Sequence, residues 1–102
     1  MNFNEFKSSL SHDSPPHNLD RELEALWWDA RGNWSKAHQS VHLMSNTSAA
    51  WVHAYLHRKE GDLTNASFWY ASALRKMPEI SLEEEWNEIV KKLLETEVQK
   101  LI

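Results

Sequence analysis

The chain has 102 residues, with six tryptophans, two glycines, three prolines and no cysteine, and its formal net charge is −4. This length supports one core rather than two ordinary domains. The lack of cysteine excludes a disulfide framework and a thiolate metal site. The scarcity of glycine and proline favours a mostly helical chain. The acidic excess lies in residues 79–102, which carry seven acids against three lysines, so the basic footprint of a nucleic-acid-binding protein is absent.

Residues 1–18 are predicted to form a short helix followed by a connector. Phe3, Phe6 and Leu10 recur at helical spacing, and the two prolines of SHDSPPHN push the residues before them away from the helical conformation. The N-terminus lacks the basic head and apolar run of a signal peptide, and no stretch approaches the run of about 18 apolar residues that spans a membrane. We therefore expect a cytoplasmic protein that does not bind membranes.

Residues 19–78 are predicted to form two helical hairpins, each of which turns at a glycine. Gly32 suits the left-handed conformation that ends a helix, and Asn33 can cap the helix that follows. Gly61 and Asp62 repeat this pair 29 residues later. This internal echo indicates a helical-repeat protein, in which stacked hairpins bury their faces against one another.

The remaining helix boundaries are predicted from capping residues and proline. The run SNTS at residues 45–48 offers capping candidates between the two hairpins, and Pro78 is expected to end the fourth helix. Ser81 and Glu84 have the spacing of a capping box, which opens an amphipathic helix over residues 79–102. Its apolar stripe consists of Leu82, Trp86, Ile89, Leu93 and Leu101, with Val90, Leu94 and Val98 beside them.

The C-terminal helix is expected to cap the last hairpin, as terminal helices do in repeat proteins. Pairing with its twin in a homodimer is the alternative. The acidic run at residues 83–85 lies in its first turn, where negative charge complements the helix dipole. We interpret this run as a helix start rather than as a site.

Small and aromatic residues follow the turn of the second hairpin at regular spacing. Tyr70, Ala73 and Pro78 stand four, seven and twelve residues after Ala66. These spacings resemble helix B of a tetratricopeptide repeat, and Ala54 fits the small position of helix A in that family. The resemblance implies an all-α fold of stacked antiparallel hairpins with a long C-terminal capping helix, within a single helical domain.

The resemblance covers residues 45–78 well and residues 20–44 less well, because the offset of 29 residues is shorter than the family period of about 34 residues. The second hairpin also departs from the family pattern. The large aromatic of helix A stands one place late, as Trp51, and His53 and His57 replace its apolar and aromatic residues. The core WVHAYLHRKEGD further resembles that of small bacterial proteins to which no activity is assigned.

The resemblance implies a peptide-binding surface on the A helices. On this alignment the contact set consists of Trp51, Tyr55, Arg58 and Lys59. Its basic members would hold a carboxylate, and its aromatic members would supply apolar contact. Trp28 and Trp69 are candidates for a second surface, because neighbouring aromatic residues on a helix cannot all face one core. We expect a non-catalytic adaptor, monomeric or homodimeric, with a protein or peptide partner and no cofactor.

The sequence contains no motif that favours an enzyme. The chain has no serine elbow, glycine-rich phosphate loop, HExxH sequence or cysteine nucleophile.

Four histidines form the alternative site. His38 and His42 are four residues apart, as are His53 and His57, and the two pairs fall on consecutive predicted helices. Two imidazoles one turn apart can share a metal, and four across a helix pair can make a tetrahedral zinc site. Packed histidines hydrogen-bonded in the core would give the same spacing. A small-ligand or metal-binding domain, with zinc as its cofactor, is therefore the alternative to the adaptor.

Overall fold

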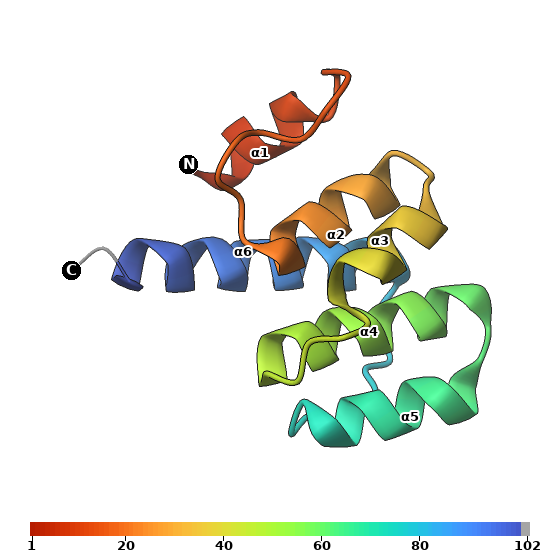
Figure 1. The fold of residues 1–102 in the computed structure, drawn as a ribbon. Coiled ribbons are helices and arrows are strands. Elements are labelled where there is room, and N and C mark those ends of the chain that lie inside the picture. Colours follow the sequence, from red (N-terminus) through yellow and green to blue (C-terminus); the bar gives the residue numbers. More distant parts are fainter. Residues whose placement is uncertain (101–102) are drawn as a thin grey trace.

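The computed structural model describes residues 1–100, with side chains described for residues 1–97 (Figure 1). Within this range there are six helices and no strand, which confirms the prediction of an all-α protein. The helices are α1 (Phe3–Ser9), α2 (Arg21–Ala30), α3 (Trp34–Val41), α4 (Thr47–Glu60), α5 (Leu63–Ser72) and α6 (Leu82–Lys100). Over the residues described, none of these helices is both long and apolar enough to cross a membrane.

The two predicted glycine turns are present. Gly32 follows α2 with φ 82° and Gly61 follows α4 with φ 89°, a left-handed conformation that glycine adopts without a Cβ clash. The side chains of Asn33 and Asp62 then cap α3 and α5 by accepting from the backbone amide three residues on, at 3.0 and 3.2 Å. Local sequence therefore sets where both helix pairs turn.

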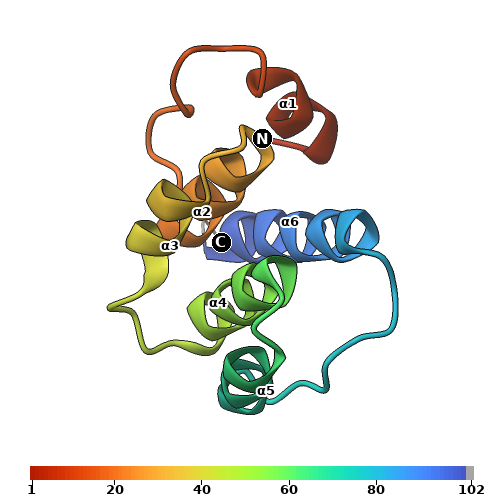
Figure 2. The same ribbon diagram turned by 90° about the vertical axis from the view of Figure 1, so that its right-hand side faces the viewer.

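The end of α5 differs from the prediction. The helix stops at Ser72 and does not continue toward Pro78. Leu74 has φ 61°, and the amide of Arg75 donates to the carbonyl of Tyr70 at 2.9 Å, as in a Schellman turn. This turn satisfies the last carbonyls of α5 and sends the chain into a connector that crosses to α6 (Figure 2).

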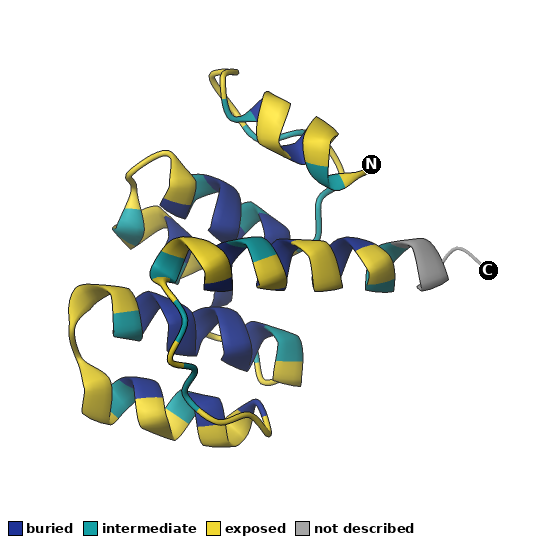
Figure 3. Ribbon diagram, turned by 180° about the vertical axis from the view of Figure 1, so that it is seen from behind, coloured by how far each residue is buried: buried dark blue, intermediate teal, exposed yellow. Residues whose placement is uncertain are grey.

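From α2 to α5, consecutive helices pack against each other, and α2 also packs against α4. Helix α2 packs against α3, α3 against α4, and α4 against α5. Helix α6 returns to lie against both α2 and α4, and α1 lies against α6. Figure 2 shows α6 beside these two helices, and Figure 3 shows buried residues concentrated on the helix faces that meet there.

The apolar stripe of α6 forms much of this contact. Its buried members are Trp86, Ile89, Val90, Leu93 and Leu94. The indole nitrogen of Trp86 donates to the carbonyl of Leu26 in α2 at 3.0 Å, which fixes the position of α6 along α2. Leu82 is half-buried, and Val98 and Leu101, also expected in this stripe, lie outside the described side chains.

The adjacent residues Trp27 and Trp28 are covered by different helices. Trp27 is fully buried, and its indole nitrogen donates to the hydroxyl of Ser9 in α1 at 3.1 Å. Trp28 is half-buried and lies beneath the ammonium of Lys36, 4.1 Å from the ring centroid. One ring is therefore covered by α1, and the other by a cation of α3.

Candidate functional site

Helix α4 contributes residues to both candidate sets. It contacts α2, α3, α5 and α6, and every residue from Ala49 to His57 is buried. A helix that is buried all round lacks a clear polar face, so polar groups on α4 must find partners inside the protein. One side of α4 meets α6 and α2, and another meets α3 and α5.

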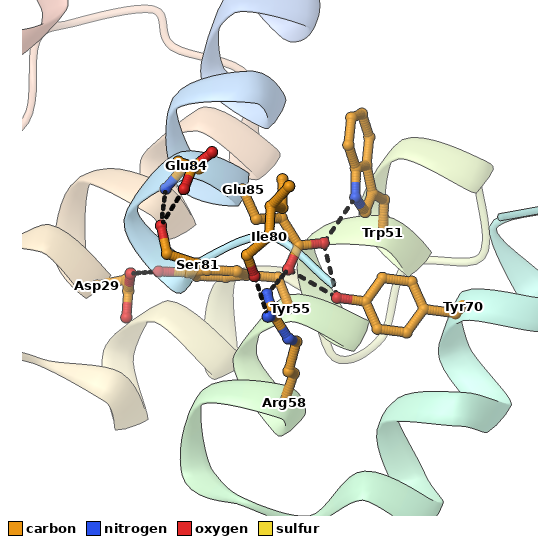
Figure 4. A network of polar contacts seen from close by, with 9 residues as sticks. All are labelled: Asp29, Trp51, Tyr55, Arg58, Tyr70, Ile80, Ser81, Glu84 and Glu85. Atoms are coloured by element: carbon orange, nitrogen blue, oxygen red, sulfur yellow. Dashed lines mark hydrogen bonds and ion pairs between the residues drawn. The ribbon is translucent and has the colours of Figure 1, made fainter. Parts of the chain in front are cut away.

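The first set surrounds the carboxylate of Glu85 in α6 (Figure 4). Glu85 is only 1% exposed. Its oxygens accept from the indole nitrogen of Trp51 at 3.2 Å, from Arg58 Nη1 at 2.8 Å and from the hydroxyl of Tyr70 at 2.6 Å. Arg58 also donates to the carbonyl of Ile80. The buried charge is thus paired and fully hydrogen-bonded.

A second buried acid lies farther along the same side of α4. Asp29 of α2 accepts from the hydroxyl of Tyr55 and from the ammonium of Lys59, both at 2.9 Å. Burial, followed by the neighbouring carboxylate of Asp29, raises the pKa of Tyr55. Burial and the hydrogen bond to Glu85 raise the pKa of Tyr70. Both phenols are therefore neutral donors at ordinary pH.

The four residues of the predicted contact set lie on α4, where they are buried in the core or paired with acids of the same chain. Trp51 and Tyr55 are core residues, and Arg58 and Lys59 are ion-paired to α6 and α2 respectively. Of the four, Lys59 has the most accessible side chain, at 40% exposed. The carboxylate expected from a peptide is supplied by the chain itself.

The sequence analysis does not predict the burial of Glu85. The acidic run at residues 83–85 is interpreted above as a helix start, although Glu85 stands three residues after Leu82 and four before Ile89. Those intervals place it on the apolar stripe of α6. This position on the apolar stripe is the feature of the sequence that indicates burial of Glu85.

The second set lies between α3 and α4. Nε2 of His38 and Nε2 of His53 are 2.9 Å apart, and the ring of His38 is nearly perpendicular to those of His53 and His57. One ring nitrogen from each of these three residues lies within 4.8 Å of one from each of the others. His42 is outside this group. Its ring stacks on the outer side, with its centroid 5.6 Å from that of His38.

Two tryptophans flank the imidazoles. Trp34 stacks on His38 with ring centroids 5.0 Å apart, and Trp69 of α5 stacks on His53 at 4.0 Å. The indole nitrogen of Trp34 donates to the carbonyl of Leu56 at 2.8 Å, which holds its ring in place. Trp69, a candidate for a second surface, is half-buried against this cluster.

The environment favours the neutral form of His38 and His53, and it orients the ring of His57. Burial, and then the neighbouring imidazoles of His38 and His57, lower the pKa of His53 to about 4. Burial likewise lowers the pKa of His38. Nδ1 of His57 lies 2.9 Å from Glu60 Oε1, a carboxylate–histidine pair that leaves Nε2 for another partner. Neutral imidazole is the form that binds metals.

Burial distinguishes the two possible ligand groups that include His57. Nδ1 of His53 is buried and has no hydrogen-bond partner among the described residues, an arrangement that costs about 1–3 kcal/mol. His57 also belongs to a group with Glu60 and Asp62, but both carboxylates are exposed. Two of the three histidines, His53 and His57, are buried, so the three-histidine group is the stronger ligand set.

Comparison of the chain with protein-family models, with curated proteins and with solved structures finds no match. The side of α4 that faces α6 has its polar groups bonded within the chain. The histidine side brings one ring nitrogen from each of three residues together, and Nδ1 of His53 has no partner there among the described residues.

Proposed function

We propose that the protein binds a divalent transition-metal ion, with zinc as the best fit, through His38, His53 and His57. The supporting observation is the convergence of three ring nitrogens within 4.8 Å. With Zn–N bonds of about 2.0–2.1 Å, ligand nitrogens in a tetrahedral site are about 3.3 Å apart. The 2.9 Å His38–His53 pair would therefore open slightly while the wider pairs close.

The remaining contacts suit such a site. Glu60 holds Nδ1 of His57, the arrangement in which an outer carboxylate orients a metal-bound imidazole. Imidazole ligands suit zinc, copper and nickel rather than magnesium or calcium. An ion bound here would join α3 to α4 and thereby stabilise the fold, because binding free energy adds to folding free energy.

Equilibrium dialysis of tag-free protein against zinc tests this proposal. We expect one zinc per chain, and we expect His53→Ala to lower the affinity at least about 100-fold, since loss of even an outer-shell partner costs 10–100-fold. His17→Ala is the matched control, because His17 is exposed in the connector before α2 and should bind as the wild type does. Absence of bound zinc, or equal loss in both variants, would contradict the proposal.

The fold class proposed for this chain is tetratricopeptide-like. In this proposal the α2–α3 and α4–α5 pairs are stacked antiparallel hairpins capped by α6. The positive φ of both turn glycines and the complete burial of Ala54 and Ala66 support it. The face that would bind a peptide then lies under α6, so an adaptor role for Trp51 requires α6 to move away.

A protein contact through α5 is the second candidate function. The segment from Leu63 to Leu74 contains no charged residue, and Leu63, Phe68 and Leu74 are 55%, 62% and 84% exposed. Among the described helices the backbone of α5 lies close only to that of α4, and Tyr70 joins α5 to α6 through Glu85. The proposed occupant is a second copy of this chain, because an uncharged face meets no like-charge repulsion when it pairs with itself across a two-fold axis.

Sedimentation equilibrium tests the second candidate. Wild-type protein should dimerise at about 100 μM, and Phe68→Glu should leave a monomer. Leu43→Glu is the matched control, since Leu43 is 86% exposed outside α5, and this variant should dimerise normally. A monomeric wild type would eliminate the α5 dimer without affecting the metal proposal.

A further inference from the structure

We infer that the metal keeps its fourth coordination position open to an exogenous anion, and that His42 does not close the site. This inference rests on the metal-binding function proposed above. Structural zinc sites have four protein ligands, whereas sites with three protein ligands hold water or another small ligand in the fourth position. An open fourth position requires that the chain supplies no metal ligand besides His38, His53 and His57.

His42 is the nearest further imidazole and is poorly placed. It is the C-cap residue of α3, it is exposed, and its Nδ1 lies 3.2 Å from the carbonyl of Gln39. Its ring nitrogens are outside the group that converges within 4.8 Å. To act as a ligand the exposed ring would have to leave its stack on His38 and bring Nε2 into the group from outside.

Glu60 does not complete the coordination either. Its Oε1 is bonded to Nδ1 of His57, and the two nitrogens of an imidazole point in divergent directions. A carboxylate held at Nδ1 therefore orients the ring from outside while Nε2 faces the ion. Glu60 is a positioning residue for His57.

Charge favours an anion as the fourth ligand. Three neutral imidazoles leave the full charge of a divalent ion uncompensated, and His53 and His57 are buried. A buried charge requires a counter-charge, and Glu60 lies on the far side of the His57 ring. His38 and Trp34 are half-buried, so a small anion can approach the group from the α3 side. A carboxylate or a comparable small anion fits this position.

Cobalt(II) and azide provide the test, because the visible absorption of bound cobalt reports its ligands and geometry. We expect the wild type to bind one cobalt, azide to change the spectrum, and azide at ten times its own dissociation constant to tighten apparent cobalt binding about tenfold. His42→Ala should behave in the same way, with a cobalt affinity within about threefold of the wild type, well short of the 10–100-fold effect of losing an outer-shell partner.

The outcomes separate this inference from the proposed function. A cobalt spectrum that ignores azide, together with at least about tenfold weaker binding by His42→Ala, means that His42 closes the site; the open position is then overturned and metal binding stands. An azide-insensitive spectrum with normal binding by His42→Ala also overturns the inference, because another group then fills the position. If wild-type protein binds neither cobalt nor zinc, the proposed function itself fails. His12→Ala, which changes an exposed histidine in the loop after α1, controls for adventitious binding.

Discussion

At the scale of single residues, Glu85 explains how α6 is held against α4. A buried carboxylate is stable only when it is paired and hydrogen-bonded, and this one accepts from Trp51, Arg58 and Tyr70. Those three donors come from α4 and α5, so one side chain of α6 organises two other helices. The ion pair adds specificity of position to the apolar contact of α6.

Removal of this carboxylate should destabilise the fold strongly. Glu85→Ala leaves Arg58 and two other donors without their acceptor, and we expect a loss of about 3–5 kcal/mol in the free energy of unfolding. Glu83→Ala, an exposed glutamate of the same turn, should change stability by no more than about 0.5 kcal/mol. Urea denaturation compares the two, and similar effects would mean that the Glu85 network does not hold α6.

Leu74 presents a backbone cost that a substitution can relieve. It has φ 61° and is exposed, so its Cβ is strained in the left-handed region and its side chain contributes little packing. We expect Leu74→Gly to raise the free energy of unfolding by about 0.5–1 kcal/mol.

Leu43→Gly provides the control for this change, since Leu43 is equally exposed but lacks a positive φ. Thermal unfolding should show a higher midpoint only for Leu74→Gly. A lower midpoint for that variant would contradict the claim that Leu74 strains the turn.

The residue scale is also where sequence reasoning was weakest. The helical pairs His38–His42 and His53–His57 followed from spacing of four, but their distances across α3 and α4 depend on tertiary packing. The structure brings three of the four together and leaves His42 outside. The burial of Glu85 likewise depends on partners more than ten residues away in the chain.

At the scale of elements, most boundaries were predictable because they are set locally. Glycine conformation and side-chain caps placed the turns after α2 and α4 correctly. The end of α5 was predicted wrongly, because a leucine in the left-handed conformation is unfavourable and no local rule favours it over continued helix toward Pro78. The turn there depends on the surrounding fold.

The contact between α4 and α5 depends on small residues. Ala54 and Ala66 are both fully buried, and small side chains allow helix axes to approach to about 8–10 Å. We expect Ala66→Leu to overpack this contact and to cost about 1–3 kcal/mol.

Ala71→Leu is the matched variant, because Ala71 is exposed on the same helix and should change stability by about 0.5 kcal/mol or less. Urea unfolding of the two proteins provides the comparison. Equal stability of Ala66→Leu and the wild type would show that α5 is free to shift away from α4.

At the scale of the whole molecule, the described helices are connected around α4, and the proposed ion adds a link between α3 and α4. Binding to the native state alone raises the free energy of unfolding, by about 2.7 kcal/mol when free zinc is 100 times its dissociation constant. We therefore expect zinc to raise the thermal midpoint and a chelator to reverse the rise.

His53→Ala should abolish this stabilisation, and His17→Ala should retain it. A zinc-induced shift of the same size in both variants would place the ion elsewhere on the chain.

The most direct measurement is a crystal structure of the zinc-loaded protein with anomalous data on both sides of the zinc absorption edge. The proposal predicts one zinc peak among the rings of His38, His53 and His57, with bonds of about 2.0–2.1 Å to their nitrogens. A peak on exposed carboxylates alone, or density in which His38 and His53 remain hydrogen-bonded to each other without an ion, would contradict it.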